Sequence, residues 1–159
     1  MRDIRKALTT LGACALLSAC AASPGGNLAP TPEKGSHIGI LDDNMNYVGD
    51  CFAGFFWPDR EFKSDGSRNW VFVDPYNGTA ELQFDGRHLI LKRTSHKGSE
   101  DNGQVRNRYI NTDPQLLVEL DYKVTDADPD GARFYDGQLR VKSAYGLEVL
   151  NLKGAGGCL

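Results

Sequence analysis

The most chemically suggestive stretch of this 159-residue chain is the acidic run DADPDG. Asp126, Asp128 and Asp130 alternate along it, and Gly131 follows. Carboxylates at alternate positions before a glycine match the first half of a calcium-binding loop, in which hard oxygen ligands converge. The loop pattern then asks for a bidentate glutamate at a position where this chain has Gly137. Two interpretations remain, a weak calcium site and a solvated acidic turn between strands, and we favour the turn.

A second group of reactive side chains lies in the polar stretch of residues 94–108. It contains Ser95, His96 and Asp101, which are the residue types of a nucleophilic triad. Catalysis requires a packed group that holds and orients the base, and one polar stretch does not supply it. His88, another candidate base, is expected on the outward face of a strand. We therefore expect a protein that is not an enzyme and that uses no cofactor apart from the calcium ion considered above.

The N-terminus has the pattern of an export signal. Residues 1–6 carry three basic side chains and one acid, and residues 7–19 are mostly apolar. This apolar run is too short for a membrane-spanning helix, which takes roughly 20 residues, but it fits a secretory signal peptide. The run leads into LSAC, residues 17–20, which resembles the lipobox of bacterial lipoproteins.

The lipobox resemblance implies covalent lipid attachment. It implies cleavage before Cys20, a diacylglycerol on the Cys20 thiol, and a further acyl chain, such as palmitate, on the new amine. Two or three chains anchor a protein firmly, because each buried methylene contributes about 0.8 kcal/mol. In Gram-negative lipoproteins a residue other than aspartate after the cysteine, here Ala21, implies export to the outer membrane. We expect residues 1–19 to be the signal peptide and the remainder to face the periplasm from that membrane.

Charge limits the partners of the exported chain. The formal net charge is −3 for the whole chain, and residues 1–19 carry three basic groups and one acid, so the remainder carries −5. Nucleic-acid binding depends on Lys and Arg that neutralise phosphates, and an acidic domain argues against it. An acidic surface can attract a basic protein, although modest acidity also serves solubility. We expect a membrane contact through lipid and a protein partner, but no nucleic acid.

The chain divides into a linker, residues 20–36, and a domain, residues 37–159. The linker residues are small and rich in Pro and Gly, so they bury too little surface to order themselves. Cys51 and Cys158 are the two cysteines that follow Cys20. Such a pair in an exported protein predicts a disulfide. The alternative, a two-thiol metal or redox site, lacks a CxxC motif and neighbouring histidines.

Alternation of apolar and polar residues predicts an all-β domain, a small antiparallel sandwich or barrel. The expected strands and hairpins cover residues 51–57, 69–74, 80–92, 115–124 and 138–153. Asp85-Gly86 predicts a tight hairpin turn, because both turn positions favour positive φ. Residues 94–108 are predicted to form a long exposed loop.

Aromatic residues concentrate in the first third of this domain. They are Phe52, Phe55, Phe56, Trp57 and Trp70. Large aromatic side chains in small β domains usually fill the core, and we predict this role for them. The alternative is a surface platform for a carbohydrate or a protein partner.

Two segments resemble the membrane-bound lysozyme inhibitor family. LQFDGRHLILKR, residues 82–93, is similar to that family's F-x-Y-D-x-x-x-L-x-L-K hairpin, and GARFYDG, residues 131–137, to its GARYSDG segment. The resemblance implies a small antiparallel β-barrel on a lipobox lipoprotein. Asp130-Gly131 stands where the family's inhibitory loop has Ser-Gly, and the second loop has serine after its lysine instead of glycine. The residues that would contact a partner are Arg133, Tyr135, Lys142 and Ser143.

These observations give three hypotheses for function. The first is an outer-membrane lipoprotein whose domain binds another macromolecule, with an inhibitor or immunity protein against a cell-wall hydrolase as its sharpest form. The second is a structural or assembly lipoprotein of an envelope complex. The third is a calcium-dependent binding module.

Overall fold

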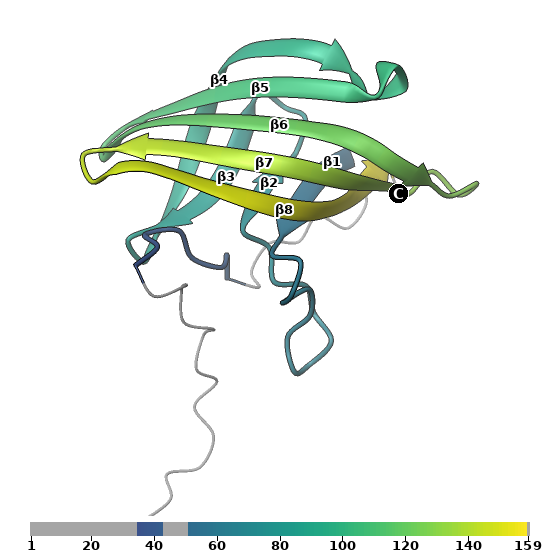
Figure 1. Ribbon diagram of the computed structural model, residues 1–159, viewed down its shortest axis with the longest axis horizontal. Coiled ribbons are helices and arrows are strands. Elements are labelled where there is room, and N and C mark those ends of the chain that lie inside the picture. Colours follow the sequence, from purple (N-terminus) through teal and green to yellow (C-terminus); the bar gives the residue numbers. More distant parts are fainter. Residues whose placement is uncertain (1–34, 43–50, 159) are drawn as a thin grey trace, which may run out of the picture.

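Eight antiparallel strands close into a barrel in the computed structural model, which describes residues 35–42 and 51–158 (Figure 1). Each strand pairs with the next along the chain, and the last pairs with the first. The elements are β1 (Cys51–Phe56), β2 (Phe72–Asp74), β3 (Thr79–Phe84), β4 (Arg87–Ser99), η1 (Glu100–Asn102), β5 (Gln104–Thr112), β6 (Gln115–Ala127), β7 (Arg133–Ser143) and β8 (Gly146–Cys158). This confirms the all-β prediction in its barrel form. The predicted signal peptide, Cys20 and the linker up to residue 34 lie outside the described residues.

Alternation along each strand separates an apolar interior from a polar exterior. In β6, Leu116, Val118 and Leu120 are buried, while Glu119 between them is on the outer face. Successive side chains of a strand point to opposite faces, so one set of alternate residues fills the barrel. The strand predicted over residues 115–124 is therefore confirmed, and it continues to Ala127. No helix within the two described ranges is long and apolar enough to cross a membrane.

Both predicted hairpins are present. Asp85 and Gly86 connect β3 to β4 with φ angles of 50° and 71°, so both turn positions have the positive φ expected of them. The second hairpin joins β7 to β8 through Ala144 and Tyr145. Its strands pair from Ser143↔Gly146 to Arg133↔Gly156, which makes the hairpin longer than predicted.

The loop predicted over residues 94–108 is wrong. β4 runs on to Ser99, η1 makes the turn, and β5 begins at Gln104. The two strands pair from Lys92↔Ile110 to Ser99↔Gln104, with an irregularity between Arg93 and Ser95. Main-chain hydrogen bonds form this ladder whatever the side chains are, so polar residues such as His96 and Asn107 on its inner face and Arg106 on its outer face do not prevent strand pairing. The polar composition of residues 94–108 therefore predicted a loop where the chain forms a pair of strands.

Aromatic side chains fill much of the interior, as predicted for the cluster after Cys51. Phe55 is fully buried and lies edge-on to Phe72 and Tyr122, with ring centroids 6.4 Å and 5.3 Å away. Phe56 and Trp57 are also buried, whereas Phe52 and Trp70 are half-buried and lie against each other.

The seam between β1 and β8 closes the barrel. Six residue pairs form it, from Cys51↔Cys158 to Phe56↔Lys153, and the predicted disulfide joins the first pair. The strands approach closely because β8 is rich in glycine there. A β-carbon added to Gly156 would lie 2.0 Å from the carbonyl oxygen of Phe52, so a larger residue would push the strands apart.

The two ends of the barrel differ. We call the end with the β3–β4, β5–β6 and β7–β8 turns the hairpin end, and the end with η1, the β6–β7 turn and the disulfide the polar end. Residues 35–42 cross the hairpin end, where Ile38 is fully buried and pairs with Phe84. Ser36, predicted to belong to the linker, donates a hydrogen bond to Glu148 of β8, so the chain enters the described domain at this end.

Candidate functional site

A buried carboxylate anchors the polar end. Asp74, the last residue of β2, is fully buried. Its Oδ2 accepts hydrogen bonds from the Tyr109 hydroxyl at 2.5 Å and from Asn107 Nδ2 at 3.1 Å, and Arg93 Nη1 lies 3.5 Å away. Its Oδ1 accepts the backbone N–H of Tyr76 at 2.9 Å. The carboxylate is thus held by four donors from three chain segments, which offsets the free energy of burying its charge.

Tyr76 has a strained backbone. Its φ is +56°, in the left-handed region that side chains other than glycine rarely adopt, and the hydrogen bond to Asp74 holds it there. Strained residues persist only where their surroundings determine them, and they cluster at functional sites. The strain at Tyr76 therefore marks the polar end as a candidate functional site.

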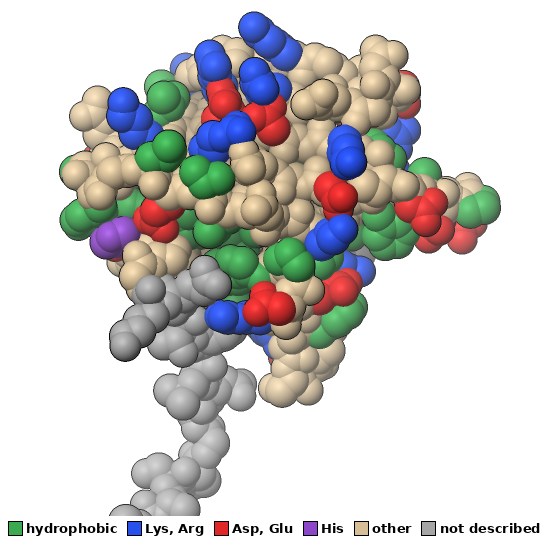
Figure 2. All heavy atoms as spheres, in the orientation of Figure 1, with side chains coloured by type: hydrophobic (Ala, Val, Ile, Leu, Met, Phe, Trp, Pro, Cys, Tyr) green, Lys and Arg blue, Asp and Glu red, His purple; other side chains and the backbone are tan. Residues whose placement is uncertain are grey.

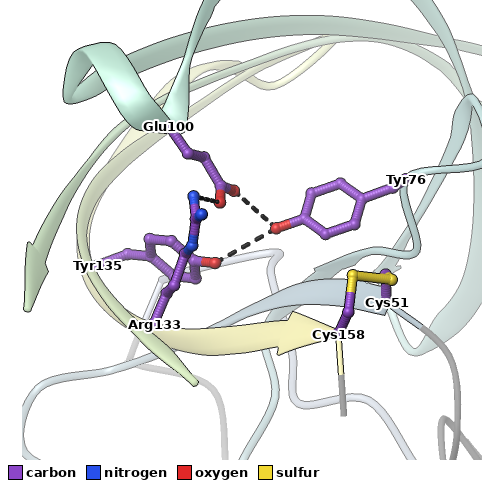
Figure 3. Close-up of a disulfide and its surroundings, with 6 residues drawn as sticks. All are labelled: Cys51, Tyr76, Glu100, Arg133, Tyr135 and Cys158. Atoms are coloured by element: carbon purple, nitrogen blue, oxygen red, sulfur yellow. Dashed lines mark hydrogen bonds and ion pairs between the residues drawn. A yellow bond between two sulfur atoms is a disulfide. The ribbon is translucent and has the colours of Figure 1, made fainter. Parts of the chain in front are cut away.

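Glu100 of η1 connects the side chains across the barrel mouth (Figure 3). Its Oε1 accepts the hydroxyls of Tyr76 at 2.7 Å and Tyr122 at 3.0 Å, and its Oε2 accepts Arg133 Nη1 at 2.8 Å. The Tyr135 hydroxyl lies 3.3 Å from that of Tyr76. Figure 3 shows Tyr76, Glu100, Arg133 and Tyr135 at the same end of the barrel as the Cys51–Cys158 disulfide.

A cavity of about 230 Å³ opens within the polar end. Its lining includes Tyr76, Arg93, His96, Glu100, Asn107 and Tyr122. The β4 irregularity at Thr94 places His96 opposite Asn107, whose side chain is inside the barrel. A bulge of this kind changes which side chains face inward, and bulges are common beside binding sites.

A larger groove of about 660 Å³ lies at the hairpin end. Its lining includes Phe84, Ile110, Leu117, Lys142, Ser143 and Tyr145. Strand register aligns Ile110, Leu117, Lys142 and Leu147 in one outward-facing row across β5–β8. The apolar members of this row are exposed, Leu117 by 47% and Leu147 by 62%. We call these four residues the exposed row.

A network of charges borders the exposed row on the outer wall. Arg140 contacts Glu119 at 3.3 Å and Asp121 at 2.6 Å, and Arg106 and Arg108 pair with the same two acids. Burial tends to raise the pKa of Asp121, but hydrogen bonds from Arg106 and Arg140 hold that pKa below its usual value. Figure 2 shows these interleaved basic and acidic side chains over the upper strands, with apolar side chains toward the left, where the β5–β6 and β7–β8 turns lie. Because these basic and acidic groups pair with one another, the exposed row, with its solvent-exposed apolar side chains, is the unusual feature of this outer surface.

The four predicted binding residues do not form one site. Lys142 and Ser143 line the hairpin-end groove. Arg133 and Tyr135 belong to the same strand but lie toward the polar end, about 30 Å and about 23 Å from Lys142 along the strand at ~3.3 Å per residue. Arg133 is paired with Glu100 and Asp101, and Tyr135 is 1% exposed. The structure therefore places the two predicted pairs at opposite ends of β7.

The predicted calcium ligands do not converge. Asp126 ends in β6, where its Oδ1 accepts the adjacent N–H of Ala127, and Asp128 and Asp130 lie in the β6–β7 turn. That turn is closed by main-chain hydrogen bonds, including Asp128 N–H to the Ala132 carbonyl. Within residues 35–42 and 51–158, no three His, Cys, Asp or Glu side chains are grouped so that they could hold a metal ion. Asp128 and Asp130 thus belong to an acidic turn between β6 and β7.

The catalytic candidates also separate. His88 is on the outer wall, as predicted, with Nε2 2.6 Å from Glu81. His96 contacts Asn107, Ser95 pairs across to Arg108, and the Asp101 carboxylate contacts Arg133. The residues that do organise the polar end, Asp74 and Glu100, were not identified from the sequence. The signal available for Asp74 was a carboxylate directly after the apolar run VFV.

Comparison with known proteins gives no relative: no family model, no curated protein and no solved structure matches this chain.

The buried tyrosines make the barrel sensitive to alkali. Burial raises the pKa of Tyr76, Tyr109 and Tyr122 far above 10, and that of Tyr135 to about 12. The folded pKa values exceed the unfolded value, so their stabilisation is complete below pH ~10 and is lost as the pH rises further. In a titration of tyrosinate absorbance with parallel circular dichroism, we expect four of the six tyrosines to ionise only as the barrel unfolds.

A Tyr109→Phe variant provides the control for this titration, because it should reduce the late-ionising group from four to three. Ionisation of all six tyrosines near pH ~10 with an unchanged dichroism spectrum would contradict the burial of these hydroxyls.

Proposed function

We propose that this protein is a lipid-anchored binding protein of the outer membrane, and that its barrel binds a protein partner at the hairpin-end groove. The observation that carries the proposal is the groove of about 660 Å³ bordered by the exposed row. Contiguous exposed apolar groups rimmed by polar ones are typical of interaction surfaces. The lipobox resemblance at Cys20 and the disulfide, a bond of oxidising compartments, support the periplasmic location.

The charges at the groove define the chemistry of the partner. Among the described residues, Lys142 has no carboxylate partner, although it stands between Leu117 and Leu147 in the exposed row. Asp85, the acid that lines the groove, already has a partner, because its Oδ1 lies 2.6 Å from His37 Nδ1. The partner surface that fits is an acidic side chain between apolar ones, because it would satisfy the ammonium while burying the row.

The anchor defines where this partner must be. Ser36 and His37 are held at the groove by Glu148 and by stacking of His37 on Tyr145, with ring centroids 4.0 Å apart. If residues 20–34 behave as the flexible coil that their composition predicts, they span about 20 Å. The groove would then lie close to the membrane surface. This favours a partner in an envelope complex at the membrane, the second hypothesis above.

Inhibition of a cell-wall hydrolase is a more specific version of the same proposal, in which the protein partner is the hydrolase. It would act through the β7–β8 turn with Lys142 and Ser143, without Arg133 and Tyr135. Activity of several muramidases with added protein from Ala21 onward tests this form, and no inhibition at micromolar protein would remove it.

The anchor prediction is tested by replacing Cys20. A Cys20→Ser variant should lose incorporation of labelled palmitate and no longer fractionate with the outer membrane, because the serine hydroxyl cannot form the thioether. Cys14→Ser is the matched control, since it changes a cysteine of the signal peptide that the lipobox does not use, and it should leave both readouts unchanged. Unaltered lipid labelling and fractionation of the Cys20 variant would refute the anchor.

The groove prediction is tested by site-specific photo-crosslinking in living cells. A photoreactive phenylalanine analogue at Leu117 or Tyr145 should give one discrete adduct, and Lys142→Glu should weaken it. Ile90 is the control position, because it is an apolar residue as exposed as Tyr145, 66% against 67%, but lies outside the groove. An adduct of equal intensity from position 90, or none from the groove positions, would contradict the proposal. Mass spectrometry of the adduct identifies the crosslinked protein, and so distinguishes a membrane protein from a hydrolase.

A further inference from the structure

The polar-end cavity contains two cationic or basic groups whose hydrogen-bonding capacity is not filled. We infer that this cavity binds a small hydroxycarboxylate, held by the guanidinium of Arg93 and by Nε2 of His96. The site lies at the opposite end of the barrel from the groove, so the inference is independent of the proposed partner.

Arg93 is the first element of this site. It lines the cavity from β4, its side chain is 23% exposed, and its contact with Asp74 is 3.5 Å long. An arginine presents five N–H donors in a planar fork that matches a carboxylate. Among the described residues no other hydrogen bond of this guanidinium occurs, so most of its donors have no protein acceptor.

His96 is the second element, and its neighbours determine its tautomer. The Asp74 carboxylate can only accept, so Asn107 directs its Nδ2 donor to Asp74 and its Oδ1 to His96. Oδ1 is an acceptor, so the His96 nitrogen 2.6 Å away, Nδ1, carries the proton. In the tautomer that carries its proton on Nδ1, Nε2 is an acceptor, and no described residue hydrogen-bonds to it.

Glu100, which lines the cavity, and Asp74, which is bonded to the lining residues Arg93 and Asn107, do not compete for a cation. Glu100 accepts three donors, from Tyr76, Tyr122 and Arg133, and Asp74 is surrounded by donors from Tyr109, Asn107 and the Tyr76 backbone. A cationic ligand would find both carboxylates already engaged. A ligand with a carboxylate for Arg93 and an adjacent hydroxyl that donates to Nε2 of His96 satisfies the groups that remain.

The size and walls of the cavity restrict the ligand further. Val105 and the ring of Tyr122 supply apolar surface beside the two polar groups. A volume of about 230 Å³ lies below the usual ~300–1,000 Å³ range of sites for drug-sized molecules, so we expect an acid of a few carbon atoms. Lactate is the simplest acid with both groups, and glucuronate is a larger one.

The test is an NMR titration of the ¹⁵N-labelled protein with lactate, glucuronate, propionate and lactamide, followed at the His96 ring and the Arg93 side chain. Propionate lacks the hydroxyl and lactamide lacks the charge. We expect at least one of the two hydroxycarboxylates to bind saturably with a Kd at or below about 1 mM, and both comparators to bind at least about tenfold more weakly.

Variants assign the site. Arg93→Gln and His96→Gln should each weaken binding at least about tenfold, whereas Arg87→Gln and His88→Gln, which change the same residue types at exposed positions near the other end of β4, should not. Circular dichroism checks that each variant folds, and if Arg93→Gln does not fold, His96→Gln decides the question. Absence of saturable binding by both acids, equal binding of lactamide, or equal effects of the Arg87 and His88 variants would each overturn the inference.

Discussion

Pairing of the first strand with the last is the constraint on which this structure depends. Without the β1–β8 seam the eight strands would form an open sheet, with no enclosed interior and no opposed ends. Three features fix the seam: six paired positions, close approach over Gly156, and a disulfide whose cysteines are 107 residues apart. A crosslink over so long a loop stabilises a fold by up to about 4.7 kcal/mol in the chain-entropy model, a large share of a small domain's stability.

Closure brings together side chains that are distant in sequence. Tyr76 follows β2, Glu100 belongs to η1 and Tyr135 to β7, yet their oxygens meet at the polar end. Local irregularities then select which side chains enter the barrel, as the bulge at Thr94 does for His96. The opposite end exposes apolar side chains and is crossed by residues 35–42, so one barrel presents two surfaces of different chemistry. The proposed protein partner and the inferred small acid use one surface each.

Residue patterns predicted the local parts of this structure well. The alternation in β6, the turn at Asp85-Gly86 and the pairing of Cys51 with Cys158 each depend on a few residues with one dominant physical preference. The loop predicted over residues 94–108 was wrong, because strands with polar side chains on both faces have the composition of a loop. The resemblance in sequence did not reveal that Arg133 and Lys142 lie toward opposite ends of one strand, β7. The network around Asp74 was not predictable, since it requires the closed topology.

Amide hydrogen exchange of the oxidised protein tests closure most directly. In a closed barrel the amides of β1 and β8 are paired on both sides, so we predict that their protection matches that of β6 and β7, which are interior strands in any arrangement. Rapid exchange along the facing edges of β1 and β8, at the rate of unpaired edge strands while β6 and β7 remain protected, would contradict the closed barrel and both binding sites built on it.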